Sequence, residues 1–243
     1  MSHPCLRLEC FPLEATDCGM HHNTANREIL EVWDWENGLP TGDPVARDIA
    51  HRDGTPHESV HLWIVRNIRT ETQLLFQHRA AHKEYYPDCL DITVGGHVPY
   101  GFGGNKVLKE TYEEIGIIPD EKNLIDLGWY RYEEKNDRHF QRELQHVFLL
   151  EDNRDLDRYH FKDGEVSGLY AVRLDDLRRI IAGDVRIEVS VFTGKETIRK
   201  TIARKDFHPQ LFDSSMYIYM RVVLRAAEEL SAAGRVTTTM PDL

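Results

Sequence analysis

The chain has 243 residues, of which 41% are hydrophobic and 9% aromatic, as in an ordinary globular protein. No apolar run approaches the roughly 20 residues that a membrane-spanning helix needs, and the N-terminus lacks the basic start and apolar core of a signal peptide. The formal net charge of −11 argues against binding to nucleic acid or to an anionic membrane. An anionic ligand would also be repelled, so a metal or local basic residues would have to offset this field.

The cysteines indicate a reducing compartment. Three of the four lie within the first 27 residues, and none has the Cys-x2-Cys spacing typical of zinc sites: Cys5, Cys10, Cys18 and Cys89. We interpret them as free thiols of a cytoplasmic protein. Zinc binding beside the doublet of His21 and His22 is the weaker alternative. Residues 1–27 have no hydrophobic period and are expected to form an N-terminal arm.

Hydrophobic alternation predicts strands in the first part of the chain, over residues 29–35, 59–66 and 71–77. Between the first two, a short helix is expected over residues 44–50, begun by Asp43. These strands lead towards the most informative part of the sequence.

A helix is expected over residues 105–115. Asn105 is suited to cap its N-terminus, and Gly116 is placed to end it in a left-handed conformation. Residues 90–94 lead into the pair Gly95-Gly96 before this helix, where the absence of Cβ atoms lets the backbone approach a ligand closely.

The rest of the chain continues the alternation of strands and helices. Strands are expected over residues 124–132, 142–150 and 185–192, a helix closed by Gly183 over 174–182, and a long amphipathic helix over 216–232. We divide the α/β chain into an arm (1–27), a core domain (28–182) and a C-terminal extension with the long helix (183–243). The extension is expected to cover the core or to join a partner subunit, which leaves a homodimer open.

Three carboxylates mark the helix over residues 105–115. Glu110, Glu113 and Glu114 follow an i, i+3, i+4 spacing that gathers them on one helix face. Like charges this close repel by roughly 0.2–0.5 kcal/mol per pair, and a divalent cation would offset the repulsion. Oxygen ligands suit a hard ion such as Mg2+ or Mn2+. A solvated acidic face on a surface helix is the alternative.

This segment resembles the Nudix box, Gly-x5-Glu-x7-Arg-Glu-U-x-Glu-Glu-x-Gly-U, where U is aliphatic. Six of the nine specified positions match: Gly96, Glu110, Glu113, Glu114, Gly116 and Ile117. The pattern is degenerate elsewhere: Phe102 replaces the first Glu, Lys109 replaces Arg and Thr111 replaces the aliphatic residue. The loop before the helix is also one residue shorter than the pattern.

The flanking sequence is similar to the isopentenyl-diphosphate-isomerase-like branch of the Nudix superfamily over about residues 28–182. The segments that carry this resemblance are 31–34, 38–42, 50–54, 57–64, 74–83, 86–87, 163–166 and 174–177. It implies a Nudix fold, in which a mixed β-sheet is sandwiched between α-helices, here with a helical C-terminal extension.

The resemblance also implies roles for individual residues. Glu110, Glu113, Glu114 and the main-chain carbonyl of Gly95 match metal-ligand positions of the family. One of Glu110, Glu114 and Glu143 would activate the attacking water. For Glu143, an ion pair with its neighbour Arg142 at the surface is an equal alternative.

Basic residues are expected to hold the diphosphate. Arg47, Arg79 and Lys83 fall at or near positions that grip it in the isomerases, although charged side chains are solvated by default. Lys109, at the Arg position of the box, is expected to orient a carboxylate, but it lacks the planar fork of Arg.

His51, His57 and His97 align with three metal-binding histidines of the isomerases. The interval from His51 to His57 is one residue shorter than in those enzymes, and of their two paired glutamates the first falls on Gln141 and the second on Glu143. Three histidines with a carboxylate form a sensible ligand set for a transition metal. Hydrogen-bonded structural histidines are the alternative.

The resemblance therefore predicts a Mg2+-dependent (or Mn2+-dependent) hydrolase that cleaves a diphosphate bond in a nucleoside diphosphate linked to another group. Isomerase activity is disfavoured because Gly95 stands where the isomerases have an essential Cys. The alternative is a non-catalytic ligand-binding or regulatory module. Phe102, Lys109 and the shortened loop favour that alternative, whereas the three helix glutamates favour catalysis.

Overall fold

The computed structural model describes residues 28–183 and 185–243. The expected N-terminal arm, with its three cysteines and the doublet of His21 and His22, lies outside the described residues. No helix in the described part of the chain is long and apolar enough to cross a membrane. Cys89 is a buried free thiol.

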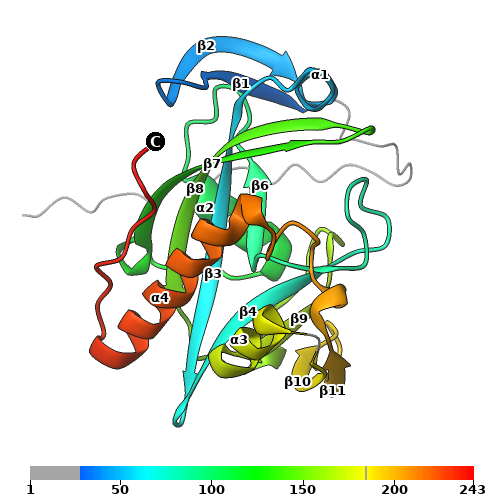
Figure 1. The fold of residues 1–243 in the computed structure, drawn as a ribbon, viewed down its shortest axis with the longest axis vertical. Coiled ribbons are helices and arrows are strands. Elements are labelled where there is room, and N and C mark those ends of the chain that lie inside the picture. The colour runs from blue at the N-terminus through cyan, green and yellow to red at the C-terminus, as the bar shows by residue number, and fades with distance from the viewer. Residues whose placement is uncertain (1–27, 184) are drawn as a thin grey trace, which may run out of the picture.

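A mixed β-sheet forms the framework of the fold (Figure 1). Its strands are β1 (Ile29–Asp34), β2 (Leu39–Ala46), β3 (His57–Ile68), β4 (Glu71–Arg79), β5 (Leu90–Asp91), β6 (Val94–His97), β7 (Ile125–Lys135), β8 (Phe140–Glu151), β9 (Val166–Arg173), β10 (Ile187–Phe192) and β11 (Thr197–Ile202). The order along the sheet is β11-β10-β9-β4-β3-β1-β2, with β5 on β4, β6 and β8 on β3, and β7 on β8. β3 and β8 run parallel, whereas β3 is antiparallel to β4 and β6.

Helices cover both faces of this sheet. They are α1 (Arg47–Asp53), α2 (Lys106–Ile115), α3 (Leu174–Ala182) and α4 (Tyr217–Ala233), with short 3-10 helices at Glu121–Asn123, Leu156–Arg158, Arg204–Asp206 and Ser214–Met216. Figure 1 shows α4 crossing one face of the sheet. The expected sheet between α-helices, with a C-terminal helix, is confirmed.

The alternating side chains of β3 explain this layering. Trp63 and Val65 belong to one hydrophobic cluster, which contains the buried apolar residues of α3 and α4. Leu62 and Ile64 point to the opposite face and belong to a second cluster, which includes Val107 of α2. Because successive side chains of a strand face opposite ways, a strand buried on both faces needs apolar residues at nearly every position.

The predicted metal-binding helix is confirmed in position and in both caps. The side chain of Asn105 accepts a hydrogen bond from the backbone N–H of Leu108 at 3.2 Å. Gly116 ends α2 in the left-handed conformation, with φ of 73°. The strands expected over residues 29–35, 59–66, 71–77, 124–132, 142–150 and 185–192 correspond to β1, β3, β4, β7, β8 and β10.

The helix expected over residues 44–50 is wrong in its first part. Residues Leu39–Ala46 form β2, and α1 starts only at Arg47. β2 pairs with β1 alone, and Pro44 lies opposite Glu31. Because an edge strand leaves N–H groups unpaired, it tolerates a proline that a central strand would not.

The residues after 182 continue the same sheet and core. β10 pairs with β9, and β11 pairs with β10. Tyr219 and Val223 of α4 are fully buried in the cluster that also contains Trp63. The sequence does not predict β9 and β11. A contact of this region with a partner subunit stays a prediction.

We expect Gly116→Ala to lower the free energy of unfolding by about 1–3 kcal/mol, because a non-glycine residue is strained at positive φ. A Cβ there would also lie 2.5 Å from the carbonyl oxygen of His160. Urea unfolding measures the loss. Gly234→Ala is the matched control, since Gly234 has φ of 64° and nothing within 4 Å of a Cβ. Equal losses in the two variants would show that the contact with His160 has no energetic role.

Candidate functional site

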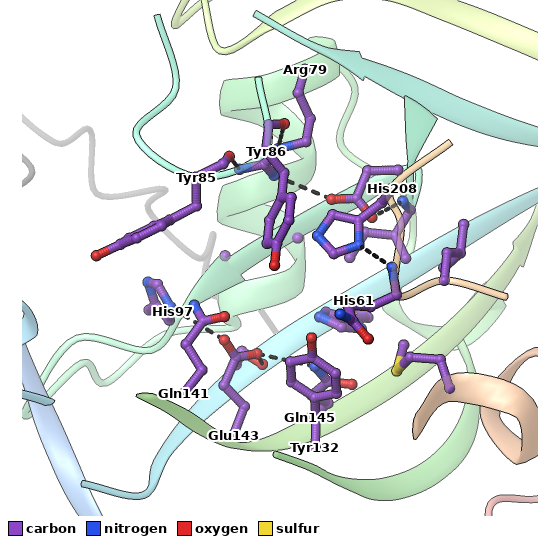
Figure 2. A pocket seen from close by; sticks show the side chains of 18 of the residues that line it. His61, Arg79, Tyr85, Tyr86, His97, Tyr132, Gln141, Glu143, Gln145 and His208 are labelled. Atoms are coloured by element: carbon purple, nitrogen blue, oxygen red, sulfur yellow. Dashed lines mark hydrogen bonds and ion pairs between the residues drawn. The ribbon is translucent and has the colours of Figure 1, made fainter. Parts of the chain in front are cut away.

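A cavity of about 150 Å³ lies where β3, β6 and β8 meet the loop after β4 (Figure 2). Its polar lining consists of Arg47, Ser59, His61, Gln77, Arg79, Tyr85, Tyr86, Asp91, His97, Tyr132, Gln141, Glu143, Gln145, His208 and Gln210. Two of these side chains are carboxylates, and most of the others can donate hydrogen bonds. Such a lining suits an oxygen-rich, anionic ligand.

Three histidines gather beside one another, and one of them, His97, lines the cavity. They are His51 from α1, His57 from β3 and His97 from β6. Their ring centroids are 5.0 to 5.2 Å apart. The antiparallel pairing of β6 with β3 places His97 opposite Ser59, close to His57. Within residues 28–183 and 185–243, they are the only group of three or more His, Cys, Asp or Glu residues whose ligand atoms all lie within 4.8 Å of one another.

His51 and His57 are uncharged near neutral pH. Burial, reinforced by the charge of His97, lowers the pKa of His51 to about 2 and that of His57 to about 4. Nδ1 of His57 lies 2.9 Å from the carbonyl oxygen of Thr55, so it carries the proton and donates it. This leaves Nε2 of His57 with a free lone pair.

The unpartnered nitrogens fit a metal ion. Nε2 of His57 and both ring nitrogens of His51 are buried, with no hydrogen-bond partner among the described residues. A buried polar atom without a hydrogen-bond partner lowers the free energy of unfolding by about 1–3 kcal/mol. The neutral imidazoles of His51 and His57, with His97 once it has lost its proton and with the carboxylate of Glu143, could hold a divalent transition metal. Metal binding by these histidines stays a prediction, with hydrogen-bonded structural histidines as the alternative.

Glu143 completes the polar end of the cavity. On β8 it pairs with His57 of β3, and its carboxylate accepts hydrogen bonds from Ser59 Oγ at 2.9 Å and Gln145 Nε2 at 3.1 Å. Nε2 of His97 lies 3.8 Å from the other carboxylate oxygen (Figure 2). Burial opposes ionisation, but the nearby positive charge of His97 holds the pKa of Glu143 well below its usual value.

The ion pair between Glu143 and Arg142, the alternative from the sequence, is not observed. Arg142 points to the other side of β8 and pairs with Glu133 at 2.6 Å. Glu143 is 7% exposed, so the strand buries the carboxylate and leaves the guanidinium at the surface.

Glu114 lies directly behind the cavity wall. It is 2% exposed, and its Oε2 accepts hydrogen bonds from Gln77 Nε2 at 3.0 Å and from the N–H of Gly95 at 3.3 Å. Both donors line the cavity. Burial raises the pKa of Glu114 well above its usual value, and the charge of Glu110 adds to the shift. A cation close to Glu114 would therefore be strongly stabilising.

Glu110 packs against the glycine pair. A Cβ on Gly96 would lie 2.5 Å from the carboxyl carbon of Glu110, so glycine leaves room for this side chain in its observed position. The carboxylate lies 2.8 Å from Nζ of Lys106 and 3.3 Å from Nζ of Lys109, which also pairs with Glu113. These lysines offset part of the repulsion between the helix carboxylates. Lys109 contacts two of them, and its role in orienting a catalytic carboxylate stays a prediction.

The surroundings of α2 remain acidic even so. Asp163 and Glu165 add to the raised pKa of Glu114, whereas Lys83 acts in the opposite direction. The three helix carboxylates do not converge on a common point in the described structure. Metal binding by them and by the carbonyl of Gly95 stays a prediction.

The three basic residues predicted to hold a diphosphate lie in different places. Arg47 and Arg79 line the cavity. Arg79 is held by Asp91 at 3.2 Å and donates to the carbonyl oxygens of the two tyrosines that follow β4. Lys83 is not a lining residue and pairs with Glu165.

Sequence reasoning misses most of the polar residues of the wall, among them Gln77 and His61. Gln77 appears there only as the end of a predicted strand. His61 offers a signal, because it lies on the same face of the strand as His57 and Ser59. Neither signal says that the side chain borders a cavity.

The chain is similar to proteins of one family. A model of the NUDIX domain matches residues 55–189. An uncharacterized Nudix hydrolase of Clostridium acetobutylicum is 27% identical over 207 residues, which cover 82% of this chain and 96% of that protein. Nudix hydrolase 3 of Arabidopsis thaliana is 36% identical over 85 residues, or 34% of this chain and 10% of that protein.

A solved structure is also similar. It is a Deinococcus radiodurans protein with 20% sequence identity and a TM-score of 0.48, and the match covers 64% of this chain and 90% of that one. The NUDIX domain match extends over more than half of the chain, from β3 through β8 and α2 into β10. The protein therefore belongs to the NUDIX domain family.

Proposed function

We propose that this NUDIX pyrophosphohydrolase cleaves a diphosphate bond in a nucleoside diphosphate linked to another group, with Mg2+ or Mn2+ as cofactor. The observation that carries the proposal is the position of Glu114. Its buried carboxylate is held by Gln77 and Gly95, which are themselves part of the wall of a donor-rich cavity. A basic carboxylate at such a wall is suited to take a proton from water.

Glu143 and Glu114 would have different roles, because their pKa values are shifted in opposite directions. Glu143, whose pKa is lowered, stays ionised and is suited to hold a cation. Glu114, whose pKa is raised, is the better proton acceptor. When bound, the divalent ion would neutralise phosphoryl oxygens and lower the pKa of the attacking water. Arg47 and Arg79 would hold the remaining phosphate charge from the cavity wall.

A further part of the proposal assigns a divalent cation to His51, His57 and His97, with Glu143 as the carboxylate ligand. Support comes from the three buried nitrogens without partners and from the neutral state of two of the rings. The helix carboxylates would hold a second cation on the other side of β6, near the acidic residues that raise the pKa of Glu114.

Glu114→Gln is expected to lower kcat by roughly 10²- to 10⁴-fold, the usual contribution of a general base. The amide has the same shape, and the buried site loses a charge, so the variant should fold at least as well as the wild type. Release of a phosphorylated product from a panel of nucleotide sugars and dinucleotides, with Mg2+ or Mn2+, measures the effect.

Glu133→Gln is the matched control for this experiment, because Glu133 is a surface residue paired with Arg142. It should leave the rate unchanged. Absence of turnover by the wild type across the whole panel would favour a non-catalytic ligand-binding module instead. In that case Glu114→Gln would retain the affinity for ligand.

His51→Leu tests the histidine site. Since neither ring nitrogen of His51 has a partner, the variant without metal should be as stable as the wild type or more stable by about 1–3 kcal/mol. Mn2+ or Zn2+ should raise the melting temperature of the wild type, because binding to the native state stabilises it, and this rise should be smaller in the variant, which keeps only the helix carboxylates. A large loss of stability without metal, and no metal effect in the wild type, would instead support structural histidines.

A further inference from the structure

His61 lies on the cavity wall and has no role in the proposed chemistry. It belongs to β3, is 8% exposed and lines the cavity (Figure 2). Its Nδ1 lies 2.9 Å from the hydroxyl of Tyr219, which is 158 residues further along the chain on α4. Nε1 of Trp63 donates to the same hydroxyl oxygen at 2.8 Å.

The direction of these hydrogen bonds follows from the chemistry of the three groups. Indole Nε1–H can only donate, so Trp63 uses the oxygen of Tyr219 as its acceptor. Tyr219 is fully buried, and burial holds the pKa of its hydroxyl well above the usual value, so the hydroxyl keeps its proton. That buried proton needs an acceptor, and among the described residues Nδ1 of His61 is the acceptor within reach.

The state of His61 is then defined. Because Nδ1 accepts the hydroxyl proton of Tyr219, it carries no proton of its own, so the ring is neutral. A neutral ring that accepts at Nδ1 carries its proton on Nε2. Among the described residues Nε2 has no hydrogen-bond partner, and the ring borders the cavity.

We propose that His61 is a substrate-binding residue whose neutral Nε2–H donates a hydrogen bond to a phosphoryl oxygen in the cavity, and that Tyr219 and Trp63 act as positioning residues by fixing its tautomer. The inference rests on the proposed function for the identity of the ligand. Tyr219 thereby makes α4 part of the binding site. A neutral donor also recognises the diphosphate without adding positive charge beside the histidine cluster, where it would oppose a metal ion.

A purely structural reading is that the bond between His61 and Tyr219 only anchors α4 to the sheet. In that case Nε2 of His61 needs no particular protonation state, and its NMR signal should not change when a ligand binds. The two readings therefore differ in the state of the ring and in which replacement of His61 is tolerated.

Long-range proton–nitrogen NMR of the 15N-labelled full chain reads the tautomer directly, with inorganic pyrophosphate as the probe ligand. We expect Nδ1 of His61 to be unprotonated and Nε2 to carry the proton, with the Nε2–H signal shifting when pyrophosphate binds. Tyr219→Phe should produce a mixture of tautomers. A proton on Nδ1 in the wild type, or an Nε2–H signal that does not respond to bound pyrophosphate, overturns the proposal.

Two substitutions of His61 separate its two nitrogens. The amide nitrogen of Gln can reach the position of Nε2, whereas that of Asn lies near Nδ1. We expect His61→Asn to raise KM by roughly 10- to 100-fold, the loss of one hydrogen bond to a charged group, with little change in kcat. His61→Gln should recover most of the affinity, and equal KM values for wild type, Gln and Asn would refute the assignment.

Tyr130→Phe is the matched control for Tyr219→Phe. The Tyr130 hydroxyl donates to the carbonyl oxygen of Ser215 at 2.6 Å, and its ring packs on Tyr219 at 5.4 Å. The Tyr130→Phe variant therefore loses a hydroxyl beside α4 but leaves the hydrogen bond of His61 intact. Its KM should stay at the wild-type value. If the wild type hydrolyses no diphosphate, the proposed function fails, while the pyrophosphate experiment still decides the role of His61.

Discussion

The pairing of β3 with β6 on one side and β8 on the other is the constraint on which the site depends. It places His57 beside Glu143 and Ser59 opposite His97, so side chains from three strands share one face. A slip of one residue in either register would turn this set to the opposite face of the sheet. The apolar residues of β3 prevent such a slip, because Leu62 and Trp63 must each enter a different hydrophobic cluster.

The glycine pair of β6 links this face to the helix behind it. The N–H of Gly95 reaches Glu114, and the missing Cβ of Gly96 makes room for Glu110. The two key carboxylates therefore lie in opposite surroundings although a single short strand separates them. Donors and histidines favour the ionised form of Glu143, whereas burial and neighbouring carboxylates oppose it at Glu114. Carboxylates with pKa values moved apart in this way are suited to different chemical roles.

Much of this arrangement could be predicted from the sequence where the signal is local. Alternation revealed the central strands, and cap residues defined both ends of α2 with its three glutamates. The failures occurred where tertiary pairing overrides local preference: β2 contains two prolines but is stabilised as an edge strand, and most of β11 is exposed and depends on β10. The histidine cluster was only an alternative in the sequence, because spacing cannot show whether ring nitrogens find hydrogen-bond partners.

The contact between His61 and Tyr219 had no sequence signal, since nothing local relates residues 158 positions apart. Yet it changes how the C-terminal region should be understood. A helix that only covered the core would need apolar side chains towards the sheet, as Val223 and Ala226 provide. A phenol hydroxyl buried among them must have both a donor and an acceptor to be tolerated. Trp63 provides the donor and His61 the acceptor, both from β3, the strand that carries the site. The same hydrogen bond therefore holds α4 against the sheet and sets which nitrogen of His61 carries the proton.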